Sequence, residues 1–163
     1  MKENMVMITS KSDSILVVNI PDLKFRRIWN KRGTRYPFDK ELIEQAMYYP
    51  DFSSLVNMGL LYIEDLEFKK EIGIEPQDAT EPVNIIDVTG NLLKRMITVM
   101  PISELQNTLK KMSEPQRAEV GEYAVEHYQD LKMDRVDLLQ KATGKNILKA
   151  IENKKSADAS TAN

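Results

Sequence analysis

The sequence of 163 residues contains no cysteine, one histidine and one tryptophan, and its six glycines are isolated from one another. Without cysteine the chain has no disulfide, no thiolate nucleophile and no zinc site with sulfur ligands. Isolated glycines argue against a loop that wraps a phosphate group. Thr143-Gly144-Lys145 resembles the end of such a loop, but Leu139 stands where the motif needs its first glycine.

Long apolar runs are also missing. The longest run, Met58–Ile63, is interrupted by Gly59 and is far shorter than the roughly 20 residues that cross a bilayer. The apolar stretch Met5–Ile8 is shorter than the apolar region of a signal peptide, and Glu3 and Asp13 flank it. We therefore expect no contact with a membrane, and a protein that stays in the cytoplasm or assembles there.

The net charge of −2 is small, but the charges are unevenly distributed. Residues 1–60 carry nine Lys or Arg against seven Asp or Glu, whereas residues 61–100 carry four against eight. The remainder is balanced, with ten of each sign. Such polarity favours head-to-tail contact between copies or with partners. The alternative is an ordinary solvated surface on which both signs of charge are mixed.

The order of predicted elements indicates an α+β protein, in which a small β-containing N-terminal half precedes a bundle of short helices. β-branched or alternating runs predict four strands, at residues 15–20, at 23–30 with a bulge or bend near Arg26-Arg27, at 60–63 and at 83–87. Apolar residues at helical spacing predict helices at residues 40–48, 50–58 and 66–72, and a series of helices from Thr89 onward.

Four segments follow from this pattern. We expect an N-terminal arm (1–14), an α+β subdomain (15–82), a mainly helical subdomain (83–153) and a disordered tail (154–163). The boundary at residue 82 follows a polar loop, 74–82, that contains two prolines. The tail consists of small and polar residues that bury little apolar surface, so it is expected to be disordered.

Several helix boundaries carry specific local signals. Asp39 and Asp134 are predicted N-caps, because a short acceptor side chain satisfies the free N–H groups of a first helical turn. Ser113 and Gln116 have the spacing of a capping box. Gly121 lies inside the helix that follows, where glycine costs about 1 kcal/mol relative to alanine. We therefore expect another element to pack closely against Gly121.

Candidates for catalysis and metal binding are sparse. His127 lies on a predicted helix and has no recognisable nucleophile motif to serve. The acidic groups Glu64-Asp65-x-Glu67 and Asp78-x-x-Glu81 do not follow the spacing of a calcium loop. An exposed acidic rim explains them better. We therefore predict a protein that is not an enzyme and that uses no metal and no cofactor.

The most unusual stretch is KFRRIWNKRGTRYPFDK, residues 24–40. Seven of its seventeen residues are Lys or Arg, four are aromatic, and its only acid is Asp39. Cations beside aromatic side chains are typical of surfaces that dock onto other proteins. The predicted partner-binding residues are Lys24, Arg26, Arg27, Trp29, Lys31, Arg32, Arg35 and Tyr36.

Two other interpretations of residues 24–40 remain open. The cations are able to neutralise phosphates while Trp29 and Tyr36 stack on unpaired bases, which makes nucleic acid a possible partner. Alternatively, the aromatic residues belong to the core and the cations protect the edge of a hairpin from aggregation. A second basic region, Met133–Lys154, has the outline of a helix-turn-helix with several lysines on its second helix, but short lysine-bearing helices are common.

The stretch WNKRGTRYPFDKELIEQAMYYPDFSSLVNMGLLYIED, residues 29–65, resembles small structural proteins of tailed bacteriophages. MPISELQNTLKKMSEPQRAEVGEYAVEHY, residues 100–128, is similar to their helical half, so the resemblance covers most of residues 15–153. It implies a non-enzymatic virion or assembly component whose partners are other protein subunits. The corresponding location is the virion, or the cytoplasm of the host cell during assembly. The resemblance assigns no functional residues.

Overall fold

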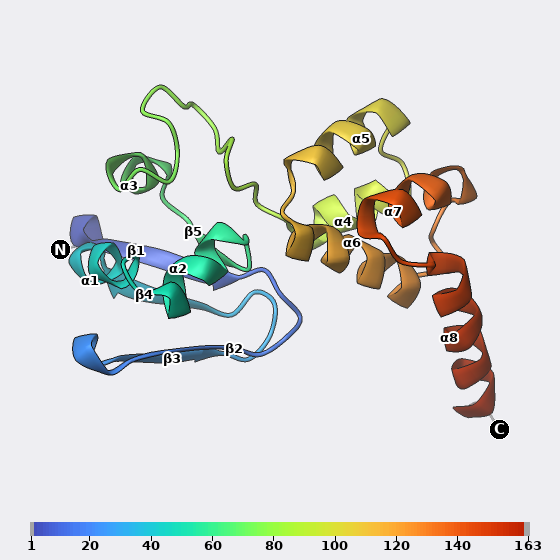
Figure 1. Cartoon of the computed structure of the whole chain (residues 1–163), viewed down its shortest axis with the longest axis horizontal. Helices are drawn as coiled ribbons and strands as arrows, with labels where there is room; N and C mark the ends of the chain where they lie inside the picture. The colour runs from blue at the N-terminus through green and yellow to red at the C-terminus, as the bar shows by residue number, and fades with distance from the viewer. Residues whose placement is uncertain (1, 162–163) are drawn as a thin grey trace. The chain divides into compact units, whose positions relative to one another are not determined.

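The computed structural model describes residues 2–161, which form two compact units divided after Asp87. The first unit contains all the described strands and three α-helices, and the second contains helices (Figure 1). The predicted α+β class is therefore confirmed. The division falls after Asp87, compared with the predicted boundary after residue 82. Within residues 2–161, no helix has the length and apolar character needed to span a membrane.

The larger sheet has three antiparallel strands, with β1 (Met5–Ser10) between β4 (Arg35–Asp39) and β5 (Leu61–Ile63) (Figure 1). The prediction that residues 1–14 form an arm is wrong, because β1 is the central strand of this sheet. Its Val6 and Ile8 side chains are buried. Both partner strands are distant in sequence, so the local composition gives little indication of the pairing.

The smaller sheet is a hairpin of β2 (Leu16–Ile20) and β3 (Phe25–Trp29). A 3₁₀ turn at Pro21–Leu23 joins the strands, and Lys24 closes it in the left-handed region at φ 51°. Pairing is continuous from Leu16 opposite Trp29 to Ile20 opposite Phe25. The predicted bulge or bend near Arg26-Arg27 is therefore wrong.

Three helices complete the first unit: α1 (Lys40–Ala46), α2 (Pro50–Asn57) and α3 (Leu66–Glu71), as predicted to within a few residues. Asp39 occupies the N-cap position of α1, but its side chain makes no capping hydrogen bond. Asp65 does cap α3, because its carboxylate accepts a hydrogen bond of 3.0 Å from the N–H of Phe68.

A long loop connects α3 to the second unit, and the strand predicted at residues 83–87 does not form within it (Figure 1). The buried Glu75 explains this difference. Its carboxylate accepts hydrogen bonds from the N–H groups of Val83, Asn84 and Ile85 at 2.9 to 3.2 Å. These N–H groups therefore bind a side chain instead of a neighbouring strand.

The second unit consists mainly of helices, as predicted from Thr89 onward: α4 (Gly90–Ile97), α5 (Ile102–Lys111), α6 (Glu114–Glu126), α7 (Val136–Thr143) and α8 (Ile147–Thr161). The capping box of Ser113 and Gln116 is confirmed. So is close packing at Gly121, where an added Cβ would lie 3.1 Å from the Cγ2 atom of Thr143.

Two predictions about the second unit are wrong. Asp134 does not cap α7, because a 3₁₀ turn comes first and Arg135 takes the N-cap position. The carboxylate of Asp134 instead binds Nε of Arg135 at 3.1 Å. The predicted disordered tail is helical from residue 154 to Thr161, with Lys154 lying 3.7 Å from a carboxylate oxygen of Glu126. Residues 162–163 lie outside the described part of the chain.

A cationic hairpin face as the candidate docking site

Residues 24–40 span β3, a turn, β4 and the start of α1, and the structure separates their aromatic side chains from most of their cations. Phe25, Trp29 and Phe38 are buried. Trp29 is 0% exposed, and its Nε1–H donates a hydrogen bond of 3.2 Å to the carbonyl of Ile8. This bond links the hairpin to the central strand of the larger sheet. The prediction that Trp29 contacts a partner is therefore wrong for the folded chain.

The aromatic side chains pack against one another in the core of the first unit. The rings of Phe25 and Phe38 stack with centroids 5.2 Å apart, and Trp29 meets Tyr36 edge-on at 5.6 Å. Tyr36 is half-buried, and its hydroxyl donates a hydrogen bond of 2.9 Å to the carbonyl of Ile28. Its ring is therefore held in place and is not free to stack on an incoming base.

Three cations of the segment are paired with acids of the same unit. Nε of Arg32 lies 3.0 Å from Asp13, and an Arg35 guanidinium nitrogen lies 2.7 Å from Glu64. The third pair joins Lys40 to Asp65 at 3.4 Å. Such partly exposed pairs each contribute about 0 to 1 kcal/mol. The predicted site residues Arg32 and Arg35 therefore have local partners already.

Arg27 has a different environment, because strand alternation places it on the same face of β3 as Phe25 and Trp29. Its guanidinium carbon lies 5.4 Å from the ring centroid of Tyr36 and 5.7 Å from that of Phe38. These distances are those of cation–π contacts. Arg27 therefore covers the edge of the aromatic core while remaining exposed.

Three predicted site residues stay exposed and form neither an ion pair nor a cation–π contact with any residue of the described chain, 2–161: Lys24, Arg26 and Lys31. Arg26 points away from the core, since its neighbours Phe25 and Arg27 lie on the inner face. Lys24 and Lys31 flank the two ends of β3.

The outer side of the hairpin also carries apolar side chains in solvent. Ile15 is 65% exposed and Val17 is 51% exposed. Val17 pairs across the hairpin with Ile28, so both lie on the face that carries Arg26. We call Ile15, Val17, Arg26 and Ile28, together with the flanking cations Lys24 and Lys31, the hairpin face. A hollow of about 350 Å³ borders it, lined by Arg26, Arg27, Ile28, Asn30 and Tyr36.

The exposed acidic rim predicted from Glu64-Asp65-x-Glu67 and Asp78-x-x-Glu81 is smaller than the sequence indicates. Glu64, Asp65 and Glu67 pair with basic residues of the same unit, and Glu75 is buried. The remaining acids of this region are exposed and form no ion pair within the described chain: Glu71, Asp78 and Glu81. We call these three the unpaired acids.

Sequence reasoning missed a buried group of ionisable residues around Glu75. Burial acts to raise the pKa of Glu75, but the N–H groups of Asn84, Val83 and Ile85 hold that pKa below its usual value. Lys69 is 2% exposed with Nζ 4.1 Å from the ring centroid of Tyr62, and burial lowers its pKa. These groups hold the long loop in place.

Tyr62 belongs to the same group. Burial raises the pKa of Tyr62 to about 12, and the charges of Asp87, Glu75 and Glu64 act in the same direction. Asp87 in turn lies 2.9 Å from Nζ of Lys11 on the chain that follows β1. Since Lys69 and Glu75 are each only 2% exposed, this group has the character of a structural anchor.

Candidates for catalysis and metal binding remain sparse within residues 2–161. His127 is exposed and its ring lies 4.2 Å from that of Tyr123. Across residues 2–161, no three His, Cys, Asp or Glu side chains gather in a way that suits a metal ion. The absence of enzymatic activity stays a prediction.

Some lysines in and beside the second predicted basic region, Met133–Lys154, also contact other side chains of the second unit. Lys145 lies 3.9 Å from Glu122, and Lys154 pairs with Glu126. Nζ of Lys155 lies 5.5 Å from the ring centroid of Tyr128. The two ion pairs reduce the positive charge that residues 145–154 offer to phosphates.

Comparison of the chain with protein-family models, with curated proteins and with solved structures finds no match. The resemblance to phage structural proteins therefore stays a prediction.

Proposed function

We propose that this protein is a non-enzymatic docking subunit of a multi-copy assembly, and that the hairpin face is its contact surface. The observation that carries the proposal is the exposure of Ile15 and Val17 on the face that presents Arg26. Apolar side chains gathered in solvent mark interaction sites when polar groups surround them. The resemblance to phage structural proteins suggests many copies, in a virion or in the host cytoplasm during assembly.

Charge complementarity suggests what the hairpin face meets. Lys24, Arg26 and Lys31 have no acidic partner within the described chain, so an acidic surface of another molecule suits them. The unpaired acids of a neighbouring copy provide one. Contact between the hairpin face of one copy and the unpaired acids of the next is head-to-tail, and such contacts form rings or filaments.

Burial of the aromatic side chains favours a protein partner over a nucleic acid. Binding to single strands depends on aromatic faces on which bases stack. Trp29 is fully buried, and the hydroxyl of Tyr36 is bound to the backbone. Nucleic-acid binding is therefore the second candidate, supported only by the exposed cations.

Sedimentation velocity over a range of protein concentrations tests the proposal. We expect the mass of the wild type to rise with concentration, and the variant Arg26→Glu/Lys31→Glu to remain monomeric. Lys94→Glu/Lys149→Glu is a matched control, because it makes the same charge change at exposed lysines of the second unit. The proposal fails if the wild type is a monomer throughout, or if the control loses association equally.

Fluorescence anisotropy with labelled single- and double-stranded DNA and RNA tests the second candidate. Binding by the cations would weaken as the salt concentration rises. On duplex DNA, a plot of the logarithm of the affinity against the logarithm of the salt concentration would have a slope of about −0.9 for each phosphate contacted. If the wild type binds in this way and Arg26→Glu/Lys31→Glu does not, the hairpin face is a nucleic-acid surface. We expect no such binding at moderate salt.

A further inference from the structure

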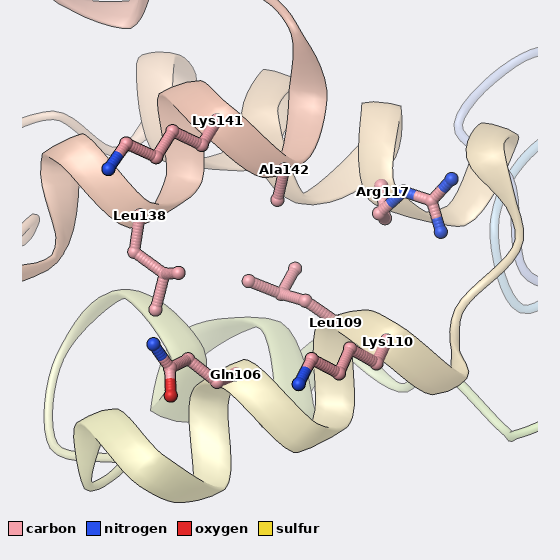
Figure 2. Close-up of a pocket in the computed structure, with 7 residues that line it drawn as sticks. All are labelled: Gln106, Leu109, Lys110, Arg117, Leu138, Lys141 and Ala142. Carbon is pink, nitrogen blue, oxygen red and sulfur yellow. The ribbon is translucent and has the colours of Figure 1, made fainter.

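A groove in the helical unit combines an apolar floor with a cationic margin. Its volume is about 360 Å³, and the residues that line it are Gln106, Leu109, Lys110, Arg117, Leu138, Lys141 and Ala142. They come from α5, the first turns of α6, and α7. Figure 2 shows the side chains of Leu109, Leu138 and Ala142 turned toward the same space.

The margin of the groove carries three positive charges and no negative one. In Figure 2 the charged ends of Lys110, Arg117 and Lys141 lie around the apolar side chains. Neither lysine forms an ion pair or a side-chain hydrogen bond with any residue from 2 to 161. Arg117 donates a hydrogen bond of 2.5 Å to the carbonyl of Met112, which holds its guanidinium in place without neutralising it.

All three cations border one groove that no acidic residue lines, so the groove attracts an anionic group. The floor beneath them is apolar, so a simple anion leaves that surface in contact with water. A ligand that satisfies both features carries acidic groups beside apolar side chains. An amphipathic segment that lays its apolar face against helices has both features.

We propose that this groove docks an acidic amphipathic segment of a partner protein, with its apolar side chains on Leu138 and Ala142, above the buried Leu109, and its carboxylates beside Lys110 and Lys141. The surface is independent of the hairpin face, since all of its residues belong to the second unit. A subunit with both surfaces contacts copies of itself through one and a different protein through the other.

Fluorescence anisotropy with three labelled peptides of about 14 residues, or four helical turns, tests the proposal. The first has leucines at helical spacing and glutamates elsewhere. The second has the same composition with the leucines scattered around the helix, and the third has glutamine in place of glutamate. We expect the first peptide to bind the full chain most tightly, because it alone matches the floor and the margin together.

Two groove variants and one control locate the binding. Lys110→Gln/Lys141→Gln is expected to weaken binding of the first peptide about tenfold, as the loss of two exposed charge pairs implies. Leu138→Gln removes the apolar contact and is expected to weaken binding to a similar extent. Lys94→Gln/Lys149→Gln makes the same charge change away from the groove and is expected to leave binding unchanged. Thermal unfolding establishes that each variant is folded.

Four outcomes overturn the proposal. The first such outcome is that the leucine–glutamate peptide does not bind at concentrations of about 1 mM, the weak end of specific affinity. The scattered peptide binds as tightly as the first, or the control weakens binding as much as the groove variants do. Finally, sedimentation shows self-association that Lys110→Gln/Lys141→Gln abolishes, which would make a second copy the occupant. Failure of association through Arg26 and Lys31 would not affect any of these results.

Discussion

The hairpin face and the group around Glu75 belong to the same unit, but their charged side chains have opposite environments. Those around Glu75 are buried and bound to other groups of the chain, whereas those of the hairpin face are exposed. Around Glu75 the carboxylate is buried, and three backbone N–H groups bind it. On the hairpin face, Arg26 remains in solvent and forms no ion pair with any described residue. Buried charge needs internal partners because desolvation is costly, whereas exposed charge needs none. We infer that the first region stabilises the fold and that the second is available to other molecules.

The largest expected effect tests whether Trp29 belongs to the core. Trp29→Ala removes a fully buried ring and its hydrogen bond to Ile8, so it should lower the free energy of unfolding by about 3 to 5 kcal/mol. Val17→Ala on the exposed side of the adjacent strand should cost less than about 1 kcal/mol. Urea denaturation measures both, and equal losses would contradict the assignment of the two faces.

The next effect concerns the anchor of the long loop. Glu75→Gln replaces a carboxylate that accepts from three N–H groups with an amide, and it removes the negative charge near Lys69. We expect a loss of about 1 to 3 kcal/mol in the free energy of unfolding. Hydrogen exchange should also speed up at residues 83–85. Unchanged exchange there would show that the loop is held by other contacts.

The raised pKa of Tyr62 predicts a pH dependence. Folding keeps this hydroxyl protonated, so its contribution to stability is complete below pH 10 and is lost as the pH rises toward about 12. Lys69 acts in the opposite sense, because burial lowers its pKa and stability therefore rises with pH until the unfolded lysine also loses its proton. Comparison with Tyr62→Phe isolates the tyrosine. Between pH 10 and pH 12 the free energy of unfolding of the variant should fall by about 1 to 2 kcal/mol less than that of the wild type. Parallel pH dependence in the two proteins would contradict the raised pKa of Tyr62.

The smallest effect on stability is expected at the hairpin face itself. Arg26→Glu/Lys31→Glu should change the free energy of unfolding by no more than about 0.5 kcal/mol, because both side chains are exposed and unpaired. Thermal and urea unfolding measure this directly. A large loss would show that these cations stabilise the hairpin, which is the structural alternative for residues 24–40.

Sequence reasoning succeeded where local signals decide the structure. The capping box at Ser113, the start of α2 at Pro50 and the close contact at Gly121 each depend on a few neighbouring residues. It failed where distant residues decide. β1 pairs with two strands far along the chain, and the segment 83–87 is bound by the side chain of Glu75 instead of forming a strand.

The candidate site was also predicted only in part from the sequence. Composition identified residues 24–40 as cationic and aromatic, but it did not separate the inner face of β3 from the outer one. Two adjacent arginines, Arg26 and Arg27, have different roles, because strand alternation sends one to solvent and the other over aromatic rings. The same limit explains why the sequence places Trp29 on the docking surface, although it lies in the core.

The most direct test of the central claim is a charge exchange between the two sides of the proposed contact. Arg26→Glu/Lys31→Glu and Asp78→Lys/Glu81→Lys are each expected to be monomeric by sedimentation velocity, and an equimolar mixture is expected to associate. The mixture restores opposite charges between the hairpin face of one variant and the acids of the other. A mixture that stays monomeric, while the wild type associates, would contradict docking of the hairpin face on the unpaired acids.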